Sequence, residues 1–137
     1  MSLFTSLFPS KPSEVPSGKK ELLYLMGIGK FEVEIIGENQ YQAVLEDIAG
    51  PRKPQGVKSF ETATLKLEDK NAVRVEILRQ PVGYLSLDSA RFIRQQLIAR
   101  GLPKGVVQCP AVIHGGWVSS DGRKGPYKVW LDLPIQA

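Results

Sequence analysis

The sequence predicts a mainly β fold of the α+β class, a small barrel or strongly curved sheet whose openings are covered by two helices. Three observations predict it. Apolar and polar residues alternate over several short segments, which is typical of half-buried strands. Two other stretches place apolar residues at helical spacing, so the expected order is β-α-β-β-β-α-β-β. No βαβ unit carries a phosphate-binding loop, so a parallel nucleotide-binding sheet is not expected.

Length and composition suit one domain with a terminal extension. The chain has 137 residues, and its 42% of apolar residues can form a sizeable core. Residues 1–30 are interpreted as a flexible leader, because residues 1–20 hold three prolines and five serines. Within this leader, the apolar segment 21–29 is expected to dock on the domain as a short strand or helix, or to contact a partner. The domain itself is expected over 31–137.

Several classes of protein are not expected from this sequence. No apolar run is long enough to cross a bilayer, and the N-terminus lacks the basic and small residues of a signal peptide. The single cysteine, Cys109, excludes an internal disulfide and a cysteine-rich zinc site. A cytoplasmic protein without membrane contact is the simplest interpretation. The net charge of +4 permits nucleic-acid binding without requiring it.

The domain is expected to begin with a strand and a helix. The strand is indicated by apolar residues that alternate with glutamates: Phe31, Val33 and Ile35. The helix is indicated by apolar residues at helical spacing: Tyr41, Val44, Leu45 and Ile48. Asn39 and Gln42 resemble a capping box at the start of this helix, and Gly50 followed by Pro51 ends it.

Two alternating segments, 60–67 and 72–78, are expected to pair as an antiparallel hairpin. Their buried candidates all have odd numbers, so opposed residues sum to an even number and the loop holds about three or five residues. The three-residue loop places Lys66 opposite Arg74. Two opposed cations are unfavourable unless a negative group lies nearby, and that group is either an anionic ligand or Glu76 together with solvent.

The remaining elements follow in order. Residues 81–85 are expected to form a short strand, with Gly83 at a bulge or at a close approach of two backbones. A helix is expected from its N-cap Ser86 to Arg100 in its last turn. The buried stripe of this helix is expected to consist of Ala90, Ile93, Leu97 and Ile98. Two final strands joined by a turn are expected within 105–117 and 125–134.

The order of several short motifs resembles the HIRAN domain. After a strand comes "GENQYQAVL", then "EDKNAV", then "VGYL", and then a helix that opens with Ser-Ala. The resemblance covers about residues 31–100 and is carried by Gly37, Glu38, Tyr41, Leu45, Asp69, Asn71, Ala72, Val73, Val75, Val82, Gly83, Tyr84, Leu85 and Ala90. More weakly, "CPAVIHGGW" and "YKVWLDLP" resemble the C-terminal β extension of bacterial stand-alone HIRAN-like proteins.

The resemblance implies an OB-like β-barrel that binds single-stranded DNA or DNA ends in DNA repair, replication or mobile-element processes. Its best-understood members hold a 3′ end in a pocket, where aromatic rings stack on bases and an aspartate accepts a hydrogen bond from the terminal hydroxyl. That aspartate aligns with Asp69. The sequence departs from the pattern at Asn39, Gln40 and Glu68, where end-binding members carry basic or aromatic residues. Loss of a stacking ring costs roughly 1–3 kcal/mol per base, so the resemblance supports the fold more strongly than the end pocket.

Seven residues form the predicted DNA site: Lys66, Asp69, Lys70, Asn71, Arg74, Tyr84 and Tyr41. The three cations are expected to hold phosphates, the two tyrosines to stack on bases, and Asp69 to contact a sugar hydroxyl. The alternatives are structural. Asp69 and Asn71 are typical turn formers, which bond local backbone, and the tyrosines are typical core or strand aromatics.

The sequence predicts no catalytic residues, metal ligands or cofactors. Cys109 and His114 lie five positions apart in an extended segment, so they face opposite sides about 16 Å apart and cannot form a nucleophile–base pair. Trp117, Tyr127 and Trp130 form either a ligand surface or core packing. The expected function is therefore a non-enzymatic DNA-binding module. The alternative is a protein-interaction module that has lost its DNA pocket, including self-association through the N-terminal segment.

Overall fold

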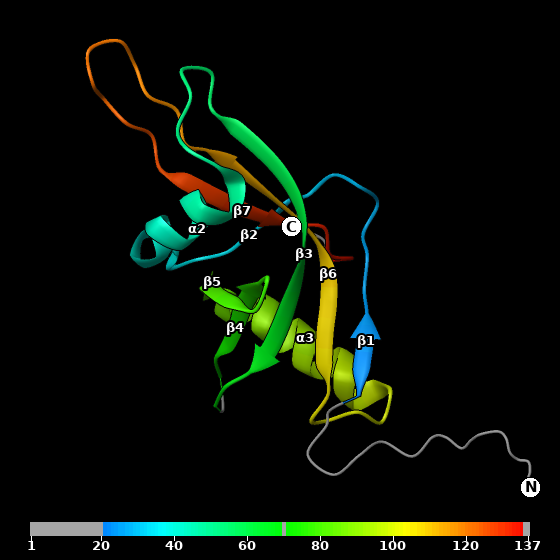
Figure 1. The fold of residues 1–137 in the computed structure, drawn as a ribbon. Coiled ribbons are helices and arrows are strands. Elements are labelled where there is room, and N and C mark those ends of the chain that lie inside the picture. Colours follow the sequence, from blue (N-terminus) through cyan, green and yellow to red (C-terminus); the bar gives the residue numbers. More distant parts are fainter. Residues whose placement is uncertain (1–20, 70, 136–137) are drawn as a thin grey trace, which may run out of the picture.

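The computed structural model describes residues 21–69 and 71–135 (Figure 1). The leader residues 1–20 and the site residue Lys70 lie outside the described ranges. In chain order, the elements are β1 (Leu22–Tyr24), β2 (Val33–Glu34), the 3-10 helix η2 (Glu38–Tyr41), α2 (Gln42–Ala49), β3 (Val57–Leu67), β4 (Val73–Ile77), β5 (Gln80–Tyr84), α3 (Leu87–Ala99), β6 (Val106–Gly115) and β7 (Tyr127–Leu131). No helix within the described ranges is long and apolar enough to span a bilayer.

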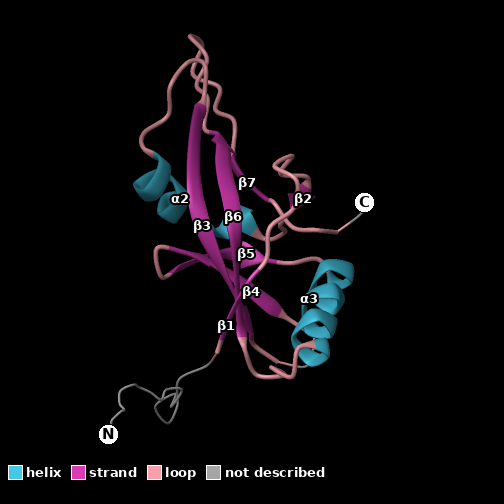
Figure 2. Ribbon diagram, turned by 90° about the vertical axis from the view of Figure 1, so that its right-hand side faces the viewer, coloured by secondary structure: helices cyan, strands magenta, loops and turns pink. Residues whose placement is uncertain are grey.

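A curled, mainly antiparallel half-barrel sheet forms the body of this OB-like α+β fold, so the predicted fold class is confirmed. The strand order is β2-β7-β6-β3-β4-β5, and β1 pairs in parallel with β6. The segment 21–29, expected as a docking strand or helix, therefore contributes a strand to this sheet. Figure 2 shows α2 and α3 on opposite sides of the long β3–β6 pair, because these strands twist strongly along their length.

The core lies between the sheet and the two helices. In β3, β4, β6 and β7 the fully buried residues have odd numbers, while even-numbered side chains mostly point away from the core. Helix α2 adds Leu45 to the core, and α3 adds Ala90, Ile93 and Leu97. The prediction that Ile98 belongs to this stripe was wrong. Its side chain is 65% exposed, because it lies about 100° around the helix from Leu97.

The start of α2 differs from the predicted capping box. Glu38–Tyr41 form a 3-10 turn, α2 begins at Gln42, and no side chain caps either element. Instead, Gln42 Nε2 donates to the carbonyl oxygens of Glu38 and Tyr127, each at 3.0 Å, and its Oε1 accepts the Tyr127 N–H at 2.8 Å. The side chain of Gln42 is therefore used to tie the helix to β7. The predicted end of the helix at Gly50 is confirmed.

The β3–β4 hairpin has the predicted register. Lys66 lies opposite Arg74 in an antiparallel ladder. The backbone N–H of Glu68 donates to the carbonyl oxygen of Ala72 at 2.9 Å, which leaves a three-residue loop over 69–71. The shorter of the two expected loops is therefore the observed one.

Strand β5 contains both features that were considered for Gly83. The register between β4 and β5 shifts between Val75 and Glu76, which is a β-bulge. A Cβ atom on Gly83 would lie 2.7 Å from the carbonyl oxygen of Ile36. Ile36 and Tyr84 exchange two backbone hydrogen bonds of 2.8 Å. The glycine therefore lets the segment before η2 lie directly against β5.

Candidate nucleic-acid interface

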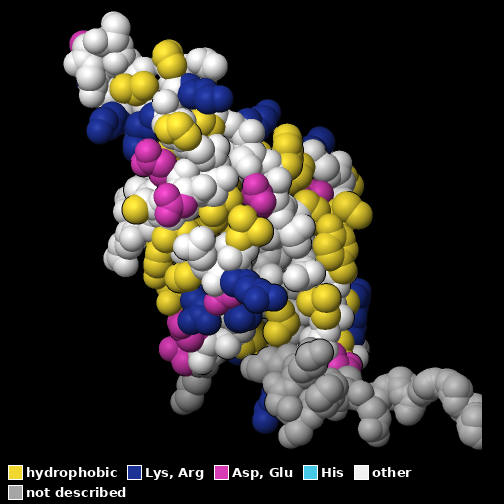
Figure 3. Space-filling view, viewed as in Figure 1, with side chains coloured by type: hydrophobic (Ala, Val, Ile, Leu, Met, Phe, Trp, Pro, Cys, Tyr) yellow, Lys and Arg dark blue, Asp and Glu magenta, His cyan; other side chains and the backbone are white. Residues whose placement is uncertain are grey.

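The predicted DNA site lies on the β3–β4 hairpin, where two opposed cations share one carboxylate. Glu76 Oε1 lies 3.2 Å from Lys66 Nζ, and Glu76 Oε2 lies 2.9 Å from Arg74 Nη2. Arg74 Nη1 lies 2.7 Å from Glu68 Oε2. The negative group that this register requires is therefore supplied by the protein. Figure 3 shows basic and acidic side chains side by side over this part of β3 and β4.

The turn between the two strands uses Asp69 for local structure. Its Oδ1 accepts the backbone N–H groups of Asn71 and Ala72, each at 3.1 Å. These two hydrogen bonds hold the pKa of Asp69 below its ordinary value. From α3, Arg94 donates to the carbonyl oxygens of Asp69 and Ala72. Asp69 thus has the turn-forming role that was the structural alternative.

Tyr84 shares a face with the hairpin cations, whereas Tyr41 lies at the start of α2. Tyr84 is the ladder partner of Arg74, so both side chains project to one face of the sheet. A hydrogen bond to Glu68, and then burial, raise the pKa of the Tyr84 phenol. Tyr41 is half-buried. The structure therefore brings Lys66, Arg74 and Tyr84 together, but with carboxylates between them.

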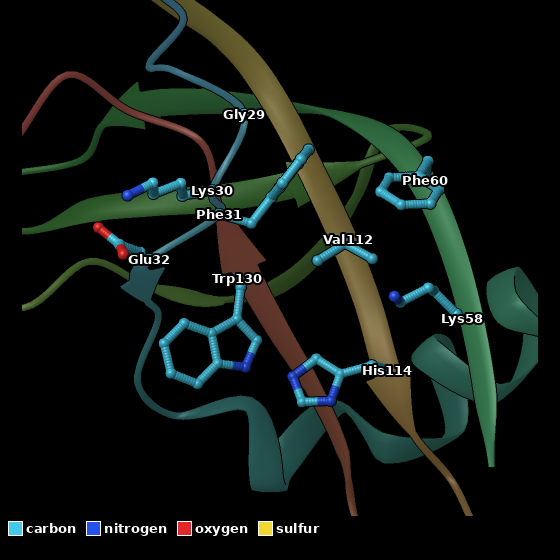
Figure 4. Close-up of a pocket in the computed structure, with 9 residues that line it drawn as sticks. All are labelled: Gly29, Lys30, Phe31, Glu32, Lys58, Phe60, Val112, His114 and Trp130. Carbon is cyan, nitrogen blue, oxygen red and sulfur yellow. The ribbon is translucent and has the colours of Figure 1, made fainter. Parts of the chain in front are cut away.

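A second site, which the sequence analysis did not predict, is an open groove of about 540 Å³ over β3, β6 and β7. We call it the aromatic groove. Figure 4 shows four rings arranged around Val112. The groove is lined by side chains of three strands and of the segment that precedes β2: Gly29, Lys30, Phe31, Glu32, Lys58, Phe60, Val112, His114 and Trp130. Its volume is in the range of ligand sites, roughly 300–1,000 Å³.

The sheet register brings the lining side chains together. Phe60 pairs with Val112 across β3 and β6, and Val112 pairs with Trp130 across β6 and β7. Two residues further along, Lys58 pairs with His114. Paired residues project to the same face of a sheet. Because the odd-numbered residues of these strands fill the core, this even-numbered set faces away from it.

The four rings form two pairs. Phe31 and Phe60 meet edge to face with centroids 5.6 Å apart, and His114 stacks on Trp130 at 5.9 Å. Phe60 is 63% exposed. Lys58 Nζ lies 5.9 Å from the Phe60 ring centroid. The groove therefore presents exposed aromatic surface beside a cation.

Phe31 reaches the groove from a segment with unusual backbone geometry. It was expected within a strand over 31–35, but β2 comprises only Val33–Glu34 and Phe31 has a φ of 50°. A positive φ costs a non-glycine residue about 1–3 kcal/mol, and such strain concentrates at functional sites. The buried Asp132 anchors the segment, because both of its carboxylate oxygens accept the Gly29 N–H, at 3.0 and 3.1 Å.

Lysines around the groove outnumber the acids beside them. Lys30, Lys58 and one acid, Glu32, line the groove. Lys128, which is the ladder partner of a lining residue, lies 3.4 Å from Glu34. Within the described ranges, neither Lys30 nor Lys58 forms an ion pair. Two cations of the groove are thus available to an anionic ligand.

His114 and Trp130 form a half-buried wall of the groove. Burial lowers the pKa of His114, Glu34 opposes this effect, and Lys128 and Lys58 add to it. The imidazole is therefore mainly neutral near pH 7. The Trp130 Nε1 atom is buried and has no hydrogen-bond partner in the described part of the chain. Figure 4 shows this nitrogen on the side of the indole that faces His114.

The remaining candidates are divided between the core and the groove. Cys109 and His114 face opposite sides of β6, as predicted, and burial raises the pKa of the Cys109 thiol to about 12. Of the aromatic residues considered as a ligand surface, Trp130 lines the groove, whereas Tyr127 is buried and donates to the Gly50 carbonyl oxygen at 2.7 Å. Among the described residues, no three His, Cys, Asp or Glu side chains are grouped as metal ligands.

Sequence reasoning missed Phe31, Phe60 and Lys58 as site residues. A signal for Phe60 was present in the chain. Phe60 has an even number in the segment 60–67, whose odd-numbered residues were expected in the core, so alternation places its ring on the exposed face. Lys58 precedes this segment, in a stretch that was interpreted as a polar loop. No such signal marked Phe31, whose position depends on the anchored segment.

Comparisons with known proteins found no match to this chain among protein-family models, curated proteins or solved structures. The HIRAN resemblance therefore stays a prediction from the order of the motifs. The proposed function therefore rests on the geometry of the hairpin and of the aromatic groove.

Proposed function

We propose that the protein is a non-enzymatic module that binds single-stranded DNA in the aromatic groove. This proposal is supported by the placement of four rings and two lysines in one open groove on the sheet, and neither lysine is in an ion pair with a described residue. Aromatic rings stack on bases without regard to sequence, and lysines beside them hold the phosphates that flank each base. Grooves with this combination are typical of OB folds that bind single strands.

The ligand is a single strand because the groove offers ring surface and few directed hydrogen bonds. In a duplex each base is stacked on its neighbours, so its faces are not accessible to Phe60 or Phe31. An unpaired base can place one face on these rings, while its edge reaches the wall formed by His114 and Trp130.

The hairpin is proposed as a weaker second contact for the same strand. Lys66, Arg74 and Tyr84 share one face, which supports a DNA contact on the hairpin. Glu68 and Glu76 already neutralise the two cations, so a phosphate has to displace an ion pair before it binds there. We therefore assign most of the binding free energy to the groove.

The test is fluorescence anisotropy with an oligothymidine of about 15 nucleotides, at low salt and across a salt series. Phe60→Ala should weaken binding roughly 5- to 150-fold, because one stacking ring is worth about 1–3 kcal/mol. Ile98→Ala is the matched control, since Ile98 is 65% exposed and Phe60 is 63% exposed. No binding at low salt, or equal affinities for the two variants, would refute the proposal.

A second candidate function is self-association through β1, and a specific observation favours it. Four apolar residues follow one another at every second position and are exposed: Leu22 56%, Tyr24 50%, Met26 58% and Ile28 83%. Leu22 and Tyr24 lie on β1, and Met26 and Ile28 follow it. An apolar row that begins on an edge strand is suited to contact with another strand. Because β1 pairs with β6, deletion of the segment would remove part of the sheet. Light scattering should therefore compare the wild type with Leu22→Ser/Tyr24→Ser, and a monomer in both cases refutes this candidate.

A further inference from the structure

A site that recognises the end of a DNA strand needs a free acceptor for the terminal hydroxyl and a positive surface for the last phosphates. The described residues of the hairpin turn, which do not include Lys70, provide neither. Asp69 Oδ1 already accepts two backbone N–H groups, and the residue is exposed, so water competes with any hydroxyl at its second oxygen. A hydrogen bond between exposed groups contributes little net affinity, because the same groups bond to water before binding.

The charges around the turn also disfavour a terminal phosphate there. Glu68 and Asp69 lie on or beside the turn, and Glu76 lies further along β4, opposite Thr64. Arg94, the cation from α3, is used to hold backbone carbonyl oxygens of the turn itself. Among the described residues, the other cations of the hairpin, Lys66 and Arg74, are in ion pairs. Of the side chains that the structure describes here, a strand end would therefore meet mainly carboxylates.

In contrast to the hairpin turn, the aromatic groove is flanked by cations. Figure 4 shows Lys30 and Lys58 on opposite sides of the groove, with Val112 between them. A nucleotide inside a strand has a phosphate on each side of its sugar, whereas the last nucleotide at a hydroxyl end has only one. Glu32 beside Lys30 reduces the charge on that side but does not pair with it within the described residues. Two cations that flank a stacking surface therefore match an internal nucleotide.

From this arrangement we infer that the groove binds internal nucleotides of a single strand, and that no free end is required. The inference rests on the proposed function, since it specifies which part of a single strand the groove takes. It also separates this protein from end recognition, which the resemblance to HIRAN domains implies. A covalently closed circle of single-stranded DNA should then bind as tightly as a linear strand.

The test compares a circular oligothymidine of about 40 nucleotides with the linear strand of the same length, as competitors for a labelled strand. The two should have dissociation constants within about twofold of each other. A linear strand with a 3′ phosphate should bind as tightly as one with a 3′ hydroxyl. A preference of about tenfold or more for the linear strand with a free hydroxyl would overturn the inference. Absence of binding by every strand would overturn the proposed function as well, so the two failures are distinguishable.

Three variants test which side chains bind the circular and the linear strand. Lys30→Ala and Lys58→Ala should each weaken the binding of circle and linear strand alike. Each should also make the slope of log K against log salt less steep by about 0.7, the value for one phosphate of a single strand. Asp69→Asn keeps an oxygen that can accept the two turn N–H groups, so the turn is retained. It should leave both ligands unaffected, and a selective loss of binding to the free hydroxyl end would contradict the inference.

Discussion

Glu76→Gln removes the negative charge that two opposed cations share, while it keeps the size and shape of the side chain. Glu76 is 8% exposed at its side chain, Lys66 44% and Arg74 32%. The pair with Lys66 is therefore largely solvated and contributes about 0.2–1 kcal/mol. The hydrogen bond to Arg74 is charge-assisted and shorter, and a glutamine oxygen retains part of it. The variant should lose about 1–2 kcal/mol of stability, which lowers Tm by roughly 4–8 °C.

The same substitution should lower the stability of the protein but strengthen its binding to DNA. Without Glu76, Lys66 and Arg74 are freer to bind phosphates, so the slope of log K against log salt should become steeper by up to about 1.4. Urea unfolding at constant m value measures the first effect, and anisotropy across a salt series measures the second. Glu46→Gln is the control, because Glu46 lies 3.9 Å from Arg52 and is 45% exposed. Wild-type stability of Glu76→Gln would refute the role assigned to the shared carboxylate.

Three further predictions test the fold and the groove. Gly83→Ala should cost about 2–4 kcal/mol in urea unfolding, because its Cβ would lie 2.7 Å from the Ile36 carbonyl oxygen; a neutral effect would contradict the close approach. Ser86→Ala should cost about 1 kcal/mol, because the Ser86 side chain accepts the Ser89 N–H at the start of α3. The folded-state pKa of His114 lies below its ordinary 6.5, so the unfolded state binds the proton more readily and stability falls as pH drops below that value. His114→Gln should reduce this fall in stability at low pH, as measured by urea unfolding across a pH series. An unchanged dependence of stability on pH would contradict the role assigned to His114.

The hairpin could be predicted from the sequence because its information is local. Odd-numbered apolar residues in two consecutive segments fix the parity of the register, and the short loop then selects Lys66 opposite Arg74. The fold class follows from the same alternation. By contrast, the failed capping box at Gln42 depends on a bond to Tyr127, which lies far away in the chain.

The aromatic groove could not be predicted as a site, because its residues come together only through the strand order. Phe60, His114 and Trp130 lie on three strands, and alternation shows which face each occupies but not which strands are neighbours. Phe31 depends on a positive φ and on the anchor at Asp132, neither of which has a pattern in the sequence. The sequence analysis therefore placed the DNA site on the hairpin. There the order of the motifs resembles the HIRAN domain, and the register sets two cations opposite each other.

The most direct test of the central claim is the fluorescence of Trp130 during a DNA titration. The chain has two tryptophans, so Trp117→Phe makes Trp130 the single reporter. If bases stack in the groove, oligothymidine should quench this emission in a saturable way, and the midpoint should move to higher DNA concentration as salt is raised. DNA binding detected by anisotropy without any change in Trp130 emission would place the strand elsewhere and contradict the account.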